Sequence, residues 1–258
     1  MVRSASVAHS SIVRAFALFT FRPDGVQAVA VAPPPAARIV ARMRDVFHDE
    51  LDEIGAGVAE MIKLVAAAVS GATSALLDAD LVRAEAVIDA DSRVDALRAQ
   101  LEDRTFQVLA RQQPVATDLR VVVTTLHLVA DLERMGDLAL HIAKIARLRF
   151  PDVAVPEDAR DVIAEMGTVA RSLVHMVGEV VDGCDVELAQ EIEAEDDAMD
   201  GLRRKLFSLV LSPRWSQGVE AAIDLTLLGR YYERYADHAV AVARRMIFIV
   251  TGERPVPA

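Results

Sequence analysis

Acidic residues four positions apart recur along this 258-residue sequence, and one such pair lies in a motif that is repeated. Glu133 and Asp137 are separated by an arginine, a methionine and a glycine; 100 residues later, Glu233 and Asp237 are separated by an arginine, a tyrosine and an alanine. A spacing of four places both carboxylates on one helix face, where like charges repel by about 0.2–0.5 kcal/mol. Such a pair suits a cation or a basic partner surface.

A second acidic pair repeats at an offset of 105 residues, and its two copies are Asp91 with Asp95 and Asp196 with Asp200. Most other acidic pairs of this spacing have no counterpart in the other half. Glu85 and Asp89, for example, correspond to Gln190 and Ala194. We interpret those unmatched pairs as solvated helix faces and retain only the repeated ones as candidates.

Each half therefore offers one Asp-x-x-x-Asp and one Glu-x-x-x-Asp on successive helices. If those helices are antiparallel neighbours, four carboxylates converge, and without a cation their repulsion would raise their pKa values. Oxygen-only ligands suit hard or borderline cations, so the candidate ions are Mg²⁺, Mn²⁺, iron and Zn²⁺. The predicted metal ligands are Asp91, Asp95, Glu133, Asp137, Asp196, Asp200, Glu233 and Asp237. The alternative is that these charges face solvent and hold no metal.

The two copies of the Glu-x-x-x-Asp motif differ around the carboxylates. The first copy has Asp131 and Gly136, and the second has Tyr231 and Ala236 at the same places. A small residue inside the motif lets a neighbouring backbone or a metal cluster come close. We therefore expect the first copy to be the better site. His238, next to the second copy, is expected to pack or face solvent rather than bind metal.

Apolar residues at helical spacing predict an all-α fold. The predicted helices cover residues 44–77, 81–110, 114–149 and 157–181, followed by one ending near Leu211 and one ending near Val250. Two prolines within residues 150–156 read as a linker. The sequence thus predicts two tandem three-helix bundles related by an internal repeat, over residues 43–150 and 156–251.

Residues 1–42 differ from the rest of the chain. They contain Arg3, Arg14 and Arg22, a short apolar patch around Phe16–Phe21 and three consecutive prolines ending at Pro35. A signal peptide is an alternative, although the apolar run is at the short end of the usual range. We expect an extension outside the fold, or a start codon assigned too early, because Met43 opens a clean helical pattern.

The composition limits which binding partners and which cellular compartment are plausible for this protein. The net charge of −11 argues against nucleic acid, which needs a basic face. One cysteine permits no intrachain disulfide and fits a reducing compartment. The longest apolar window, Leu64–Leu77, is shorter than a membrane span of about 20 residues. The mean hydropathy of +0.27 is therefore attributed to buried bundle helices, and we expect a cytoplasmic protein without membrane insertion.

Three segments together resemble the PhoU family. They are the helix entry Gln113–Arg120 (QPVATDLR), the stretch Asp131–Ala139 (DLERMGDLA), and the opening Arg44–Leu51 (RDVFHDEL). The resemblance extends from about Met43 to Val250, and the composition resembles actinobacterial members. The second half departs from the pattern, since it has Ser212–Gly218 in place of the QPVATDLR entry.

The resemblance implies two three-helix bundles related by a pseudo-twofold axis, in a protein that is often a homodimer. It implies a cytoplasmic, non-enzymatic negative regulator of the phosphate-starvation response, which modulates phosphate uptake. Its expected partners are the ATPase subunit of the high-affinity phosphate (Pst) transporter and a phosphate-sensing histidine kinase. Some members carry metal clusters on Glu/Asp-x-x-x-Asp motifs, which correspond to the eight carboxylates named above.

Two other classes of function compete with this interpretation. A carboxylate-bridged di-metal oxidase in a helical bundle needs Glu-x-x-His on two helices. No glutamate of this sequence is followed by a histidine three positions later, which argues against an oxidase. The remaining alternative is a structural helical scaffold that binds no metal.

Overall fold

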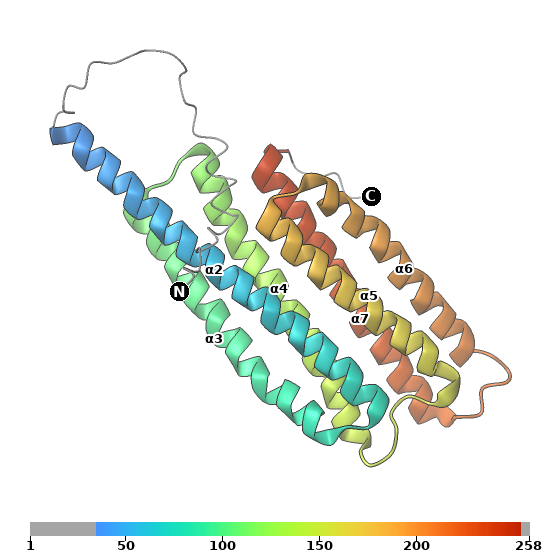
Figure 1. Cartoon of the computed structure of the whole chain (residues 1–258). Coiled ribbons are helices and arrows are strands. Elements are labelled where there is room, and N and C mark those ends of the chain that lie inside the picture. Colours follow the sequence, from blue (N-terminus) through green and yellow to red (C-terminus); the bar gives the residue numbers. More distant parts are fainter. Residues whose placement is uncertain (1–34, 254–258) are drawn as a thin grey trace, which may run out of the picture.

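The computed structural model describes residues 35–253, with side chains from residue 46 onward. Within these residues the chain is all-helical, without strands, as predicted (Figure 1). The helices are α2 (Pro35–Asp78), α3 (Leu81–Gln112), α4 (Ala116–Arg149), α5 (Glu157–Gly183), α6 (Val186–Val210) and α7 (Gly218–Thr251). The linker between α4 and α5 coincides with the proline-containing stretch that the sequence marked as the division between two halves.

The first helix begins earlier than the sequence pattern indicated. Its backbone is helical from Pro35, eight residues before Met43, so the predicted start of the helical pattern was placed too late. A proline is tolerated in the first turn of a helix, where its missing N–H would have no intrahelical partner. The remainder of the predicted extension, residues 1–34, lies outside the described residues.

Matching caps start the second helix of each half. The Asp80 carboxylate accepts a hydrogen bond from the backbone N–H of Arg83 at 3.0 Å at the start of α3. The Asp185 carboxylate, 105 residues later, accepts from the backbone N–H groups of Glu187 and Leu188 at the start of α6. The caps therefore share the offset of the repeated Asp-x-x-x-Asp pairs, and the internal repeat extends to the helix ends.

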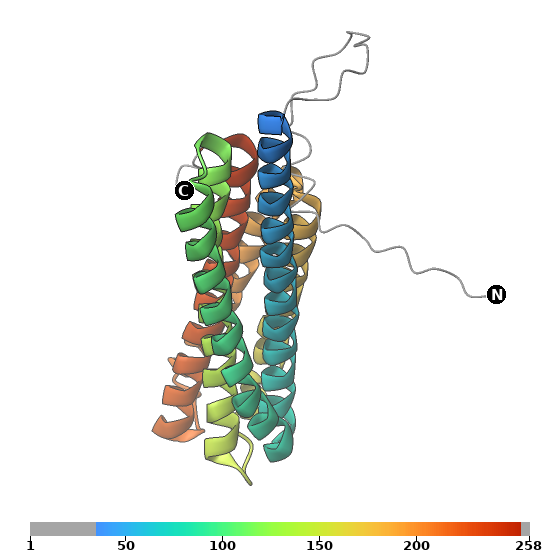
Figure 2. The ribbon, with the colours of Figure 1, turned by 90° about the vertical axis from the view of Figure 1, so that its left-hand side faces the viewer.

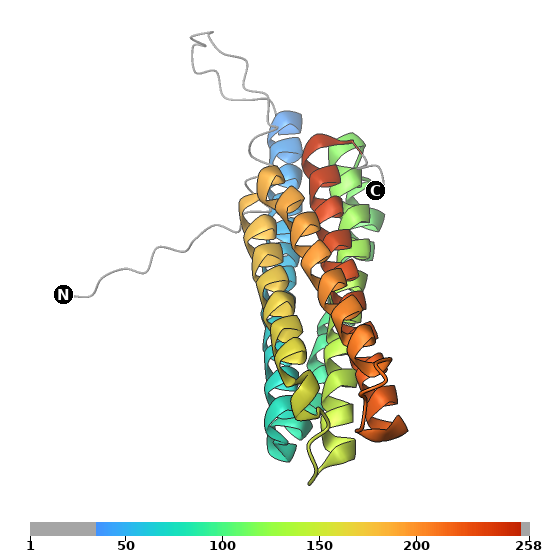
Figure 3. The ribbon, with the colours of Figure 1, turned by 90° about the vertical axis from the view of Figure 1, so that its right-hand side faces the viewer.

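The two halves are three-helix bundles joined side by side. Helices α2, α3 and α4 pack together in one, and α5, α6 and α7 in the other (Figures 2 and 3). The halves meet through two antiparallel helix pairs, α2 with α5 and α4 with α7, while α3 and α6 lie at the outer sides (Figure 1). The α4–α7 pair therefore lies at the centre of the molecule, between the predicted acidic positions of both halves.

Polar contacts reinforce the junction of the halves. Arg120 of α4 donates to the carbonyl of Ile249 at one end of the α4–α7 pair, at 3.1 Å. At the other end, Arg149 of α4 donates to both carboxylate oxygens of Asp224, which is buried. These two arginines show that α4 and α7 run antiparallel along their whole length.

The α2–α5 junction depends on a glycine. A Cβ atom on Gly167 would lie 2.3 Å from Cγ2 of Thr73, so only glycine lets the two helices approach this closely. The Thr73 hydroxyl also lies 2.8 Å from the hydroxyl of Tyr232 on α7, and both side chains are buried. Tyr232 and the neighbouring Tyr235 of α7 are completely buried.

One helix is apolar enough to be compared with a membrane span. The 33 residues Val46–Asp78 of α2 include an 18-residue window with a mean hydropathy of 1.5, which by length and composition could cross a membrane. The prediction that no stretch reaches this length considered only Leu64–Leu77 and is corrected in that respect. One apolar face of α2 packs in the core, where Val58, Met61 and Val65 are fully buried, and the core helix of a soluble protein passes the same test.

Candidate cation and partner site

The structure brings the predicted carboxylates together in two groups, one in each half. We call Asp91, Asp95, Glu133 and Asp137 the first acidic set, and Asp196, Asp200, Glu233 and Asp237 the second acidic set. In the first set, burial raises the pKa of Asp91, and the charges of Asp95, Asp137 and Glu133 raise it further. The α3 pair and the α4 pair therefore face one another, as the antiparallel arrangement predicted.

The second acidic set converges in the same way between α6 and α7. Burial, followed by the charges of Asp237, Asp200, Asp197 and Glu233, raises the pKa of Asp196 to about 6. Every cause in this case raises the pKa, whereas Lys144 lowers that of Asp91. The second set thus carries more uncompensated negative charge than the first.

Each set also contains an arginine that sequence reasoning missed. Arg98 donates to Glu133 at 3.0 Å in the first half, and Arg203 lies 3.8 Å from the Glu233 carboxylate in the second. Arg98 and Arg203 are 105 residues apart, the offset that relates Asp95 to Asp200. The signal was therefore present, since applying this offset to basic residues would have identified the pair.

The arginine inside the repeated motif behaves differently in the two copies. Arg134 pairs with Asp137 at 2.9 Å and approaches Glu133 at 3.7 Å, so it neutralises its own set. Arg234, its counterpart, is exposed and makes no ion pair with any residue that the structure describes. Glu233 instead pairs with Arg230, one turn earlier on α7.

The basic residues Lys144 and Arg244 occupy equivalent positions in the two halves but have different acidic partners. Lys144 of α4 acts on Asp91, but its counterpart Arg244 on α7 binds Glu193 of α6 at 2.6 Å. Glu193 corresponds to Ile88 in the first half. The first half therefore has no carboxylate at the position that binds Arg244 in the second half. The different charge balance of the two sets follows from this contact and from the additional carboxylate of Asp197.

The small residue of the first motif permits a close helix approach, as predicted. A Cβ atom on Gly136 would lie 3.3 Å from Cγ1 of Val94 and 3.9 Å from a carboxylate oxygen of Asp91. The neighbour at Gly136 is therefore α3 itself. The glycine brings the Asp91 side of α3 close to α4.

Asp131 belongs to a different contact from the acidic sets. Its buried carboxylate accepts hydrogen bonds from Arg245 and lies 3.1 Å from Nδ1 of His238, both on α7. Burial alone would raise the pKa of Asp131, but the hydrogen bonds of His238 and Arg245 outweigh it and lower the pKa. The Asp131 carboxylate thus links the two halves, and the expectation that His238 packs against protein agrees with this contact.

The counterpart of Asp131 makes the corresponding contact through a ring. Tyr231 of α7 stacks on His141 of α4 with ring centroids 5.2 Å apart. Asp131 with His238 and Tyr231 with His141 therefore occupy related places on the two sides of the α4–α7 junction. The first copy was expected to be the better metal site partly because it has Asp131 where the second copy has Tyr231. The structure shows that both residues serve the packing of α4 against α7 instead.

The acidic sets fit a metal by ligand type rather than by preformed geometry. Carboxylates are the oxygen ligands that Mg²⁺ and Mn²⁺ prefer, and burial together with their convergence raises the pKa values of Asp91 and Asp196. As they stand, however, no three His, Cys, Asp or Glu side chains among residues 46–253 are placed to hold an ion. Glu133 and Glu233 would have to leave their arginine partners to complete a set of ligands.

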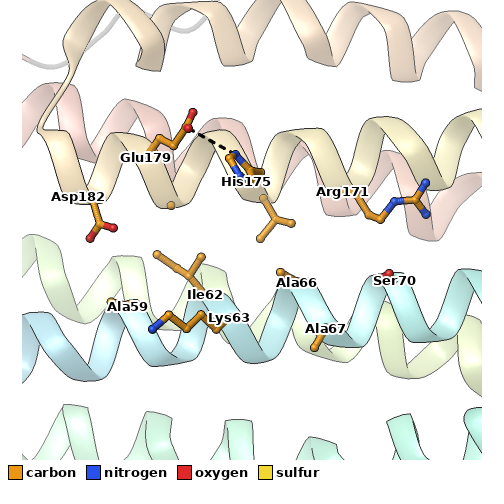
Figure 4. Close-up of a pocket in the computed structure, with 12 residues that line it drawn as sticks. Ala59, Ile62, Lys63, Ala66, Ala67, Ser70, Arg171, His175, Glu179 and Asp182 are labelled. Carbon is orange, nitrogen blue, oxygen red and sulfur yellow. Dashed lines mark ion pairs between the residues drawn. The ribbon is translucent and has the colours of Figure 1, made fainter.

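Two of the grooves lie on opposite sides of the molecule, one at each junction between the halves. A groove of about 530 Å³ between α2 and α5 is lined by Ile62, Lys63, Val174 and small side chains, with Glu179 3.7 Å from His175 at its edge (Figure 4). A second groove, of about 470 Å³, lies between α4 and α7 and includes Asp237. The α2–α5 groove contains no member of either acidic set.

The chain matches the model of the PhoU domain twice, over residues 58–146 and 163–246. It is 50% identical over 213 residues to the phosphate-specific transport system accessory protein PhoU homolog 2 of Mycobacterium tuberculosis, covering 83% of this chain and all of that protein. It is 48% identical to PhoU homolog 1 of Mycobacterium leprae, covering 83% of this chain and 96% of that protein.

A solved structure of PhoU from Pseudomonas aeruginosa superposes with a TM-score of 0.74 at 26% identity, covering 80% of this chain and all of that one. Both domain matches fall within the two three-helix bundles. The fold, the internal repeat and the curated relatives therefore agree, and the chain belongs to the PhoU family.

Proposed function

We propose that this protein is a negative regulator of the phosphate-starvation response that acts as a non-enzymatic adaptor. Family membership supports a role in regulating phosphate transport, since its relatives are accessory proteins of the phosphate-specific transport system. The finer proposal is that it contacts the ATPase subunit of the Pst transporter and a phosphate-sensing histidine kinase in the cytoplasm, as a homodimer. High phosphate then keeps the kinase inactive and restrains uptake.

The observation that carries this proposal is the repeated pair of acidic sets flanking the α4–α7 junction. In the second set, burial and the converging carboxylates raise the pKa of Asp196 to about 6. Such a surface attracts cations or basic side chains and is suited to recognition. A positively charged partner would lower the electrostatic cost of the clustered carboxylates.

We also propose that the acidic sets bind divalent or trivalent cations. Asp91, Asp95, Glu133 and Asp137 would hold one ion or cluster, and the second acidic set another. A bound cation would neutralise the clustered charge and present a less acidic surface to a partner. A bound cation would in this way change the affinity of the protein for its partner.

Deleting the gene tests the regulatory role. Expression of a phosphate-regulon reporter should rise in phosphate-rich medium and return to normal when the native gene is restored. Unchanged expression in a strain without a second PhoU-family gene would contradict the proposal. Complementation with the Asp196→Asn, Asp237→Asn double variant should restore regulation only in part if the acidic surface takes part in it.

Metal analysis tests the cation proposal separately. Purified protein should retain Mn²⁺ or Mg²⁺ after gel filtration, and the Glu133→Ala, Asp137→Ala double variant should retain less. A matched Glu157→Ala, Asp161→Ala variant, with the same spacing on α5 outside both acidic sets, controls for general loss of negative charge. Equal metal content in all three proteins would contradict the proposal that the acidic sets bind cations. It would not affect the proposed adaptor role.

A further inference from the structure

The first turns of α2 extend beyond the end of their neighbour α3. Arg111 of α3 lies 4.0 Å from Glu50 of α2, and α3 ends one residue later at Gln112. Residues 35–45 of the antiparallel α2 therefore lie past the end of α3, and Figure 1 shows this start of α2 apart from the start of α4 as well. At 1.5 Å per residue, the backbone before Val46 projects by about 16 Å.

The sequence of this projecting start divides by charge into two blocks. Residues 38–44, which we call the basic block, contain no acidic residue and three arginines: Arg38, Arg42 and Arg44. Residues 45–53, the acidic block, contain no lysine or arginine and five acidic residues: Asp45, Asp49, Glu50, Asp52 and Glu53. The first turn of α2 contains no acidic residue, so the positive charge of Arg38 opposes the helix dipole there. A partner that brings negative charge to the basic block would offset this effect.

The acidic block is only partly neutralised within the chain. Glu53 pairs with Arg104 of α3, and Glu50 lies at 4.0 Å from Arg111. Asp49 is exposed and forms no ion pair with any residue whose side chain the structure describes. Asp49 is therefore the member of the acidic block that a basic group from outside the chain can reach.

One side of α2 continues from the bundle into the projecting start. Val46 is 44% exposed, and Asp49 lies one turn further along the same side. The helix register places Ile39 and Arg42, each seven residues earlier, on that side too. This side of α2 therefore alternates apolar and charged positions, with the positive charge before the negative one.

We propose that the start of α2 pairs antiparallel with the same segment of a second copy of this chain. Antiparallel pairing lays the basic block of each copy on the acidic block of the other. A register centred between residues 45 and 46 puts Arg42 opposite Asp49, and Arg38 opposite Glu53. Both pairs occur twice, because the arrangement has a twofold axis. This pairing rests on the proposed function, which includes a homodimer, and names the surface that forms it.

The exposed apolar residue of this side lies at the centre of the same register. Val46 of each copy is then next to the twofold axis, and Met43 is within one turn of it. Apolar surface removed from water at this point stabilises the pair, while the charged positions on either side set its direction.

The order of the charges argues against two other arrangements. A parallel pair would set arginines against arginines and carboxylates against carboxylates, which is unfavourable. A membrane with anionic lipids would attract the basic block but would repel the acidic block that follows on the same helix. The antiparallel pair gives both blocks an opposite charge.

Charge reversal tests this pairing in the full-length chain, with the dimer dissociation constant measured by analytical ultracentrifugation. Arg42→Glu and Asp49→Arg each place like charges opposite one another, twice, in a dimer of that variant alone. In a mixture of the two variants, every such position faces an unlike charge again. Glu60→Arg, an exposed site on the same side of α2 but beyond the paired segment, is the matched control. Circular dichroism verifies that each variant is folded.

We expect the native chain and Glu60→Arg to dimerise with dissociation constants that agree within about twofold, since Glu60 faces no charge of the other copy. Arg42→Glu and Asp49→Arg alone should each weaken the dimer by about 10-fold or more, because two contacts become repulsive. An equimolar mixture should recover the native dissociation constant within about threefold. A purely structural effect of either substitution would not be reversed by mixing.

Two results would overturn the pairing without affecting the homodimer of the proposed function. One is a mixture that associates as weakly as the separate variants. The other is a dimer that neither charge reversal weakens.

Two further results would overturn the pairing together with the proposed homodimer. The first is a native chain that stays monomeric at the highest concentration tested. The second is a monomeric native chain that sediments with phosphatidylglycerol vesicles and no longer does so as Arg42→Glu, which would assign the basic block to a lipid surface.

Discussion

The two acidic sets are copies of one arrangement, yet their electrostatics differ. Each places an Asp-x-x-x-Asp pair opposite a Glu-x-x-x-Asp pair and supplies an arginine, Arg98 or Arg203, to the glutamate. In the first set Arg134 and Lys144 add further positive charge. In the second set Arg244 is bound by Glu193 instead.

The difference shows that a repeat can preserve ligand positions while its surroundings decide their charge. Burial, followed by the charges of Asp237, Asp200, Asp197 and Glu233, raises the pKa of Asp196 to about 6, and Asp197 among these has no acidic counterpart in the first set. The second set is therefore the stronger cation attractor on electrostatic grounds. We therefore propose the second set as the tighter cation site, which is the opposite of the ranking expected from Asp131 and Gly136.

The largest expected effect concerns the position where the two motif copies differ most, Asp131 against Tyr231. Asp131→Ala would leave Arg245 and His238 without their carboxylate partner and should lower the free energy of unfolding by about 2–3 kcal/mol. Tyr231→Ala, which removes a half-buried ring that stacks on His141 but leaves no charge unpaired, should cost less, about 1 kcal/mol. Urea denaturation measures the free energy of unfolding of both variants. Equal losses of stability would contradict the conclusion that the Asp131 contact stabilises the α4–α7 junction more than the Tyr231 contact.

The next effect compares cation affinity in the two sets. Asp196→Asn should weaken the tighter phase of Mn²⁺ binding by about 10-fold, which is about 1.4 kcal/mol. Asp91→Asn should change only the weaker phase. Isothermal titration at pH 7.5 reports both phases. If Asp91→Asn instead removes the tighter phase, the first set is the better site and the ranking drawn from charge is wrong.

A smaller effect appears in the pH dependence of metal-free protein kept in EDTA. The pKa of Asp196 in the folded protein is about 6, above its ordinary value of 3.8, so the folded state binds more protons than the unfolded state between these two pH values. Stability should therefore fall as pH rises from about 4 to about 6, by about 1 kcal/mol at most because Asp196 is partly exposed. Asp196→Asn should reduce this slope, as thermal unfolding across the range will show; an unchanged slope would contradict it.

The smallest effect comes from making the two sets alike. Glu193→Gln should release Arg244 toward the second acidic set and weaken its Mn²⁺ affinity by about threefold, roughly 0.6 kcal/mol. Lys144→Gln should strengthen Mn²⁺ binding at the first set by a similar factor. Both changes should shrink in high salt, since exposed charges are screened. A change of the opposite sign in either variant would show that these basic residues do not set the difference.

Helix periodicity explains why much of this architecture could be predicted from the sequence. Apolar spacing identified the helices, and the offsets of 100 and 105 placed the acidic residues on neighbouring helices. The cap at Asp80 was predictable because its side chain acts on a backbone N–H only three residues away. Local rules of this kind need no knowledge of tertiary neighbours.

The charge balance could not be predicted in this way. The Arg244 contact with Glu193 and the Asp131 contact with Arg245 join side chains from different helices, and their reach depends on how α7 lies against α6 and α4. Periodicity gives the face of a helix but not the register of its neighbour. The early start of α2 was missed for another reason, since Pro35 follows two other prolines and resembled a breaker.

The arginine contacts at the two ends of α4 have a consequence for cooperativity. Arg120 and Arg149 both belong to the first half, and both depend on α7 of the second half for their partners. Separating the halves would leave these guanidinium groups unpaired and expose the buried ring of Tyr232 to water. The two repeats are thus one thermodynamic unit, and a ligand bound to either half stabilises the whole protein against unfolding.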